Sequence, residues 1–101
     1  MKIEVLGFDW DESNIEKCKK HGLNIEEIES CFRQRNILVA PDVKHSQLEK
    51  RYLAIARNIK NDRLVFIAFT FRKKNKLKVI RPISARYMHK KEIEKYEQEN
   101  S

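Results

Sequence analysis

Residues 64–71 read Leu64-Val65-Phe66-Ile67-Ala68-Phe69-Thr70-Phe71, a run that is apolar on both faces of an extended chain. Such a run is typical of a central strand, whose two sides are both covered. The polar residues 73–76 follow, and the positions after them alternate along a further extended segment over 77–83. Because a short polar loop joins neighbouring antiparallel strands, we expect a hairpin at the centre of an antiparallel sheet.

Shorter segments extend the predicted sheet on the N-terminal side of this hairpin. Residues 36–40 indicate a strand that stops at Pro41-Asp42, and residues 51–59 alternate along another. On the second of these, Leu53 and Ile55 share a face, which we interpret as the side toward the core. A further short strand is predicted near the N-terminus from Ile3, Val5 and Phe8 with Trp10.

Helix-end signals predict three helices. Asp11 is suited to cap a helix over 12–20, and Gly22 fits the position just after its end. Asn24 begins a capping-box pattern for a second helix over 25–34. A last helix is expected over 89–98, with Ile93 and Tyr96 facing inward. Residues 1–101 thus predict a single α+β domain, an antiparallel sheet with two N-terminal helices and one C-terminal helix packed on it.

The net charge of +7 is concentrated in one part of the chain. Residues 44–91 carry 15 Lys and Arg against 2 Asp and Glu, whereas residues 1–43 and 92–101 are each net negative. A segment this basic attracts polyanions such as RNA, since each neutralised phosphate releases condensed counterions. Two other interpretations stay open, a lysine-rich solvated surface and a face that meets an acidic protein partner.

Several classes of protein are disfavoured by the sequence. Residues 1–10 lack the apolar segment of a signal peptide, and no apolar run is long enough for a membrane span, so we expect a cytoplasmic protein. Cys18 and Cys31 lack the spacing of a metal site and fit reduced packing residues. With only Gly7 and Gly22, the chain has no glycine-rich phosphate loop. We therefore expect neither a metal ion nor another cofactor.

Arginines interrupt the apolar patterns of the predicted strands. Arg51 and Arg57 flank Leu53 and Ile55, and Arg81 is followed shortly by Arg86. An arginine in a core-facing row is costly unless it is paired or belongs to a site, so each could be a buried strut bound to an acid. Together they indicate a convergent cationic pocket suited to a phosphodiester.

Metal-free RNA cleavage is the chemistry that such a pocket could perform. The 2′-hydroxyl attacks the adjacent phosphorus, a base takes its proton, and cations stabilise the phosphoryl charge. Candidate bases are Glu49, His21 and His45, although His21 could simply complement a helix dipole and His45 could be solvated. Candidate charge stabilisers are Arg51, Arg81 and Arg86.

The order and spacing of these motifs resemble the BrnT family of toxins over about residues 8–97. The matching segments, in chain order, are Phe8-Asp9-Trp10-Asp11, Lys20-His21-Gly22, Ile25-Glu26-Glu27, Phe32, Pro41-Asp42, His45-Ser46, Glu49-Lys50-Arg51, Arg57, Arg81 with Ile83-Ser84-Ala85-Arg86, Glu92 and Tyr96. The chain departs from the family pattern at Asn14, Cys18 and His89.

The resemblance implies a RelE-like fold and a ribonuclease that arrests translation and growth. It also implies an antitoxin with a ribbon-helix-helix-type DNA-binding domain, a heterotetrameric complex and operator contact through the antitoxin alone. Glu49, Arg51, Arg81, Arg86 and His21 are then the expected catalytic residues. Further RNA contacts are expected from Lys20, Arg57, Lys78 and Ser84. The alternatives are a non-catalytic RNA- or ribosome-binding module and an inactive antitoxin-docking protein.

Overall fold

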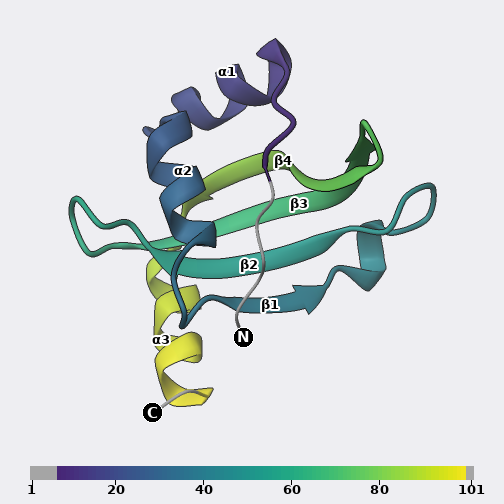
Figure 1. Ribbon diagram of the computed structural model, residues 1–101. Helices are drawn as coiled ribbons and strands as arrows, with labels where there is room; N and C mark the ends of the chain where they lie inside the picture. Colours follow the sequence, from purple (N-terminus) through teal and green to yellow (C-terminus); the bar gives the residue numbers. More distant parts are fainter. Residues whose placement is uncertain (1–6, 100–101) are drawn as a thin grey trace.

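A computed structural model describes residues 7–99 (Figure 1). Three α-helices and a four-stranded antiparallel sheet of order β1-β2-β3-β4 confirm the predicted α+β class. The elements in chain order are α1 (Glu12–Lys20), α2 (Ile25–Phe32), β1 (Leu38–Pro41), the 3₁₀ helix η1 (Val43–His45), β2 (Tyr52–Arg57), β3 (Leu64–Lys74), β4 (Leu77–Tyr87) and α3 (Lys90–Glu99).

The predicted hairpin is the long central feature of the sheet. β3 and β4 pair from Val65 opposite Tyr87 to Lys74 opposite Leu77, so the strands run further than the sequence indicated. The loop shrinks to Asn75 and Lys76, which both have positive φ angles of 52° and 67°. Two such residues form the tight turn whose twist matches that of antiparallel strands.

The predicted N-terminal strand is reduced to one bridge within the described residues. Phe8 pairs with Ile80 in parallel fashion, and the backbone N–H of Asp9 donates to the Ile80 carbonyl at 2.8 Å. Ile3 and Val5 lie outside the described residues. The segment before α1 therefore runs along the free edge of β4.

Local end signals position the first two helices as the sequence predicts. The Asp11 side chain accepts from the Asn14 backbone N–H, and Gly22 has a φ of 78° just past the end of α1. The capping box of Asn24 and Glu27 is complete at the start of α2, although α2 ends at Phe32 and not at residue 34. These ends satisfy backbone groups that a helix leaves unpaired.

The core lies between these two helices and one face of the sheet (Figure 1). Phe32 on α2 packs edge-on against Phe69 on β3, with ring centroids 4.9 Å apart. On β2 the buried side chains are Ala54 and Ala56, so the interpretation of the Leu53 and Ile55 row as core-facing is wrong. β2 is apolar on both faces, and its small alanines are the side that lies beneath the helices.

Leu53 and Ile55 instead belong to the opposite side, which we call the open face. Directly paired strand residues share a face. Leu53 pairs with Ala68 and Ile55 with Phe66 on β3, and Ala68 and Phe66 pair in turn with Ser84 and Arg86 on β4. Arg86 is therefore on the open face and not in the core.

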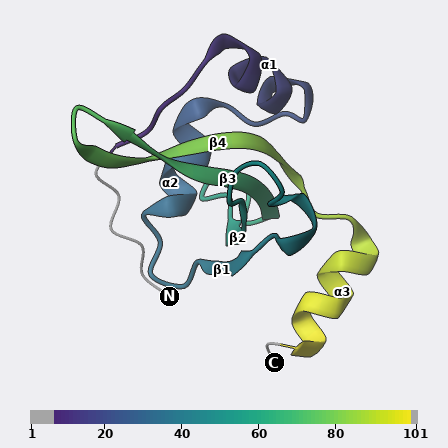
Figure 2. The same ribbon diagram turned by 90° about the vertical axis from the view of Figure 1, so that its right-hand side faces the viewer.

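Helix α3 leaves the sheet after Met88 and lies on the other side of the sheet from α2 (Figure 2). No residue of α3 is buried within the part of the chain that the structure describes. The expected inward side chains, Ile93 and Tyr96, are only half-buried. Its packing on the sheet is thus looser than expected. Within residues 7–99, no helix has the length and apolar character needed to cross a membrane.

Candidate active site

A cavity of about 300 Å³ opens on the open face, between the end of α1 and the loop before β2. We call it the open-face cavity. Its apolar floor includes Leu53, Phe66 and Ala68 from the central strands. Its polar lining consists of His21 after α1, Asp42 and His45 at the two ends of η1, Arg51 before β2, and Ser84 and Arg86 on β4. Four of the expected catalytic and RNA-binding residues, His21, Arg51, Ser84 and Arg86, are thus brought together with the candidate base His45.

Asp42 and His45 form a carboxylate–imidazole pair at this cavity. Nδ1 of His45 lies 2.9 Å from Oδ2 of Asp42. The Asp42 side chain is 12% exposed, whereas that of His45 is 60% exposed, so the carboxylate is the fixed partner of the two. The contact uses Nδ1 and leaves Nε2 of His45 for another group.

The loop that carries this pair is closed by backbone contacts. The Asp42 backbone N–H donates to the Arg51 carbonyl at 2.8 Å. The Ser46 hydroxyl donates to the Asp42 carbonyl and accepts from the Arg51 backbone N–H at 2.9 Å. Asp42, His45 and Arg51 are therefore held in a fixed relation by a single serine.

Arg51 and His21 are two further basic side chains of the cavity. Neither side chain makes a hydrogen bond or ion pair with any residue in the range 7–99. His21 ends α1, whose last turn also carries Lys17, Lys19 and Lys20. A cation at a helix C-terminus interacts favourably with the helix dipole, which accounts for its place but not for an unmatched ring at a cavity wall.

Arg86 is held by Glu92 of α3 at the edge of the cavity. Its Nη1 and Nη2 donate to the two carboxylate oxygens at 2.8 and 2.9 Å, and its guanidinium lies 5.2 Å from the centre of the Phe66 ring. The hydrogen bonds from Arg86, followed by the backbone N–H of His89, lower the pKa of Glu92 to about 2. The hydrogen bond to Glu92 likewise raises the pKa of Arg86.

Arg86 keeps donors for a ligand despite this pair. A guanidinium has five N–H groups. Within the described residues three of the five are used, two by Glu92 and one by the Tyr87 carbonyl, which leaves two, one on Nη2 and the one on Nε. An arginine with a fixed fork and free donors is suited to a phosphate.

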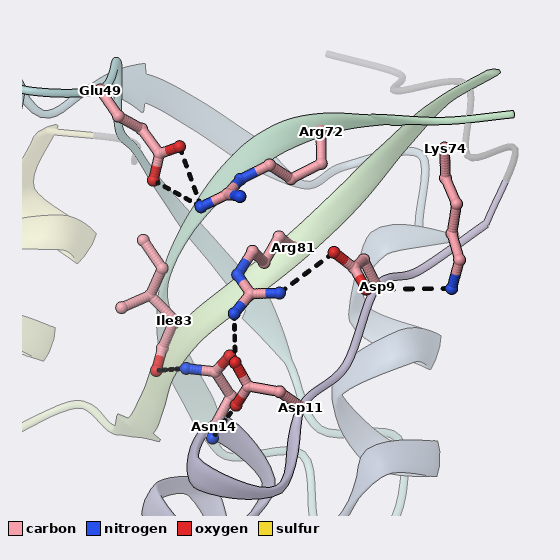
Figure 3. Close-up of polar contacts among 8 residues, drawn as sticks. All are labelled: Asp9, Asp11, Asn14, Glu49, Arg72, Lys74, Arg81 and Ile83. Atoms are coloured by element: carbon pink, nitrogen blue, oxygen red, sulfur yellow. Dashed lines mark hydrogen bonds and ion pairs between the residues drawn. The ribbon is translucent and has the colours of Figure 1, made fainter. Parts of the chain in front are cut away.

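Arg81 lies outside the open-face cavity, in contact with the segment before α1 (Figure 3). Its Nη1 donates to Asp9 at 3.0 Å, and its Nη2 donates to Asp11. The pKa of Asp11 is lowered, first by the Asn14 backbone N–H and then by Arg81. Asn14 in turn donates to the Ile83 carbonyl at 3.2 Å. These contacts match the strut interpretation of Arg81, because they join α1 to β4.

Glu49 also lies outside the cavity. Its carboxylate contacts Nη2 of Arg72 on β3 at 3.1 Å (Figure 3). It lines a neighbouring hollow together with His45 and Arg51, both of which also line the open-face cavity. Its carboxylate is therefore near the cavity but already paired.

The expected RNA contacts other than Ser84 lie apart from the cavity lining. Arg57 donates to the Asp62 carbonyl at 2.8 Å beyond the end of β2. The Lys78 ammonium lies 4.3 Å from the centre of the Phe71 ring near the β3–β4 turn. Lys20 is exposed on α1, next to His21. Of these three, Lys20 is the one adjacent to a cavity residue.

Sequence reasoning considered His45 as a base but did not pair it with Asp42. The usable signal was an aspartate three residues before a histidine, directly after the proline that ends a strand. Such a spacing suits a single tight turn, in which the two side chains face each other.

The two cysteines are buried and free, and burial raises the pKa of both thiols, that of Cys31 to about 11.

Among residues 7–99 there is no group of three or more His, Cys, Asp or Glu side chains that could hold a metal ion.

Comparison with known proteins agrees with the motifs. The sequence model of a family described as "Ribonuclease toxin, BrnT, of type II toxin-antitoxin system" matches residues 10–92, from just before α1 to the first turn of α3. No curated protein matches the chain significantly. The family match includes every polar residue of the open-face cavity. The chain therefore belongs to the BrnT family of ribonuclease toxins, whose members act in type II toxin–antitoxin systems.

Proposed function

We propose that this ribonuclease toxin is a metal-independent endoribonuclease and that the open-face cavity is its active site. The observation that carries the proposal is that basic side chains without partners among the described residues and a carboxylate–imidazole pair line the same cavity. Arg51 and His21 have no partner within residues 7–99, and beside them stands the Asp42–His45 pair with Nε2 unused. The phosphodiester of RNA supplies a negative charge for the basic side chains, and the adjacent 2′-hydroxyl supplies a proton for Nε2 of His45.

Arg51 and Arg86 bind the scissile phosphate in this proposal. Their planar guanidinium groups match the non-bridging oxygens and stabilise the charge that grows there in the transition state. The Ser84 hydroxyl, at a residue that also lines the cavity, donates a further hydrogen bond. Lys20 attracts the neighbouring backbone phosphates through its charge alone.

His45 is the general base and His21 the general acid. Nε2 of His45 takes the proton of the 2′-hydroxyl, and Asp42 accepts the Nδ1 hydrogen and stabilises the imidazolium that forms. The 2′-oxygen bonds to phosphorus while the bond to the 5′-oxygen breaks, and His21 gives that oxygen a proton. The products are a 2′,3′-cyclic phosphate and a 5′-hydroxyl. No metal-activated water is required, because the nucleophile is part of the substrate.

Residues outside the cavity have supporting roles. Arg81 is a structural strut that fixes α1 against β4 through Asp9 and Asp11. Glu49, which was a candidate base, is in this proposal the partner of Arg72. Arg57 and Lys78 act at most as distant contacts for longer RNA.

The wider setting follows from the family resemblance. We propose that the protein acts in the cytoplasm, where RNA is available and the two thiols stay reduced. Its antitoxin carries a ribbon-helix-helix-type domain, joins the toxin in a heterotetramer and alone contacts operator DNA.

The test uses the purified chain, freed of antitoxin, on a labelled single-stranded RNA in excess EDTA. Wild type should cut and leave 2′,3′-cyclic phosphate ends, and Arg51→Ala should lower kcat/KM by about 100-fold or more. Arg35→Ala is the matched control, because Arg35 is exposed and does not line the cavity. Cleavage that disappears in EDTA and returns with a divalent ion contradicts the proposal. RNA binding without cleavage supports the non-catalytic alternative.

A further inference from the structure

A second and larger hollow lies on the open face, between the sheet and α3. It measures about 770 Å³, and we call it the α3 groove. Leu38, Leu53, Ile55 and Phe66 line it from three neighbouring strands. The solvated face of an antiparallel sheet normally carries polar side chains at such positions. Here β1 and β2 present apolar side chains on the side that faces away from α1 and α2.

α3 does not fill this groove. Tyr96 lines it and is half-buried, and no described residue of α3 is buried. The Arg86–Glu92 pair attaches the first turn of α3 to the sheet. A contiguous apolar surface of this kind, rimmed by polar residues, marks a protein-interaction site.

We propose that the α3 groove docks an acidic amphipathic segment of the antitoxin. Charge decides between the possible occupants. Leu53 and Phe66 line both the groove and the open-face cavity, so an occupant of the groove also lies beside Arg51, His21 and the free donors of Arg86. An apolar stripe followed by carboxylates satisfies both surfaces, with the apolar residues in the groove and the acids over the cavity.

A second copy of the chain fits this surface poorly. A two-fold contact would place the same patch on both subunits, and each patch adjoins a cationic cavity. Two chains of net charge +7 would thus meet with their arginine-lined cavities next to each other. On its α3 side the groove carries Glu92, which is paired with Arg86, together with Lys95 and Glu99, whose charges are opposite, so its own lining selects for neither sign.

Docking in the groove would also explain neutralisation. A segment that passes over Leu53 and Phe66 covers the mouth of the open-face cavity and excludes RNA. This part of the inference rests on the proposed function, because it requires that the cavity be the cleavage site. The docking itself does not.

The first experiment measures the affinity of the purified antitoxin for toxin variants. Ile55→Glu places a carboxylate in the groove at a residue that does not line the cavity. We expect it to weaken antitoxin binding by about 30-fold or more, as for a central interface residue. Ile59→Glu and Leu77→Glu are controls, because both side chains are exposed and apolar but lie elsewhere. They should bind within about 3-fold of wild type.

The second experiment uses wild-type proteins, so that it does not depend on the folding of a variant. Hydrogen exchange of the toxin with and without antitoxin should show protection in β1 and β2 and in α3. Protection confined to α1 and the free edge of β4 overturns the proposal. So does wild-type antitoxin affinity in folded Ile55→Glu, or a toxin homodimer that Ile55→Glu dissociates.

The two proposals fail separately. Ile55→Glu should still cleave RNA and should resist inhibition by the antitoxin. Loss of antitoxin binding in a toxin that never cleaves supports the docking site and counts against the proposed active site. If Ile55→Glu cleaves RNA normally and the antitoxin inhibits it as it inhibits wild type, the result counts against the docking site and leaves the proposed active site in place.

Discussion

Arg86 and Glu92 join the open face to α3 through two parallel hydrogen bonds of 2.8 and 2.9 Å. The pair lowers the pKa of Glu92 to about 2 from an ordinary value of 4.5. The pKa of Glu92 is lower in the folded protein than in the unfolded chain. The ion pair therefore stabilises the folded state fully above pH 4.5, and this stabilisation is lost as the pH falls toward 2. Since both side chains are about one-third exposed, the effect is confined to the attachment of α3 and does not decide global stability.

We therefore predict that the start of α3 loosens between pH 4.5 and 2 while the sheet persists. The measurement is an NMR titration of the Glu92 carboxyl carbon together with amide exchange in α3. Glu92→Gln should give the loosened α3 already at neutral pH. A Glu92 carboxyl that titrates near 4.5 would contradict the ion pair.

Asp42 and His45 should act together in catalysis. His45→Ala removes the base, and we expect kcat to fall by about 100-fold to 10,000-fold. Asp42→Asn should also lower kcat but leave KM nearly unchanged, because within the described residues the Asp42 side chain pairs with His45 and its contacts with Arg51 and Ser46 are made by the backbone. His89→Ala is the control, since His89 is exposed at the start of α3. Single-turnover cleavage rates provide the test, and an active His45→Ala enzyme would remove His45 from the mechanism.

Arg81→Ala should cost stability and not chemistry. The substitution leaves Asp9 and Asp11 facing each other without the shared cation, and we expect a loss of about 1–3 kcal/mol in the free energy of unfolding. Arg72→Ala, which breaks an exposed pair with Glu49, should cost no more than about 1 kcal/mol. Urea unfolding measures both. If Arg81→Ala unfolds like wild type yet no longer cleaves RNA, Arg81 belongs to the site.

RNA binding should weaken steeply with salt. Each phosphate contact on a single strand contributes a slope of about −0.7 to the plot of log affinity against log salt. Arg51→Ala should therefore make the slope shallower by about that amount, and Arg35→Ala should leave it as in wild type. Fluorescence anisotropy between about 50 and 200 mM salt resolves the difference. A flat wild-type response would exclude phosphate contacts as the source of affinity.

The buried polar pair of Glu27 and Asn58 should stabilise the contact of α2 with β2. Asn58 is fully buried and donates to Glu27, and this hydrogen bond is the main cause of the lowered pKa of Glu27. Asn58→Ala removes one of the two donors to the buried Glu27 carboxylate and leaves the Asn24 backbone N–H, so we expect a loss of about 1–3 kcal/mol in the free energy of unfolding. Lys60→Ala is the control, because Lys60 is exposed and lies close to Asn58 in the chain. Asn75→Ala would not serve, because the positive φ of Asn75 makes any substitution there costly for another reason.

Local signals in the sequence predicted local structure well. Asp11, Gly22 and Asn24 act within a few residues of their own position, so the ends of α1 and the start of α2 follow from the chain itself. The face that β2 buries does not follow in this way. Both of its rows are apolar, and the choice of Ala54 over Leu53 is made by helices that pack from elsewhere.

The candidate site was likewise predictable only in part. Arg51 and Arg86, like Arg81, interrupt or follow apolar strand patterns, and that contrast was visible in the sequence. The partners that distinguish Arg81 from Arg86 were not visible in the sequence. Arg81 pairs with Asp9, which is distant in the chain, and Arg86 pairs with a residue of α3, whose placement no sequence pattern specifies. Two arginines of equal sequence signal thus have different environments, one tied by two aspartates and one facing a cavity.

Leu53 and Phe66 line both hollows of the open face. In the proposed arrangement they serve substrate and inhibitor at once, which limits how the toxin can evolve. A change at either side chain that frees the toxin from its antitoxin also reshapes the floor on which RNA lies. Substitutions that weaken antitoxin binding without altering the RNA site are then confined chiefly to Leu38 and Ile55. We expect natural sequence divergence between toxin–antitoxin pairs to concentrate at these two positions.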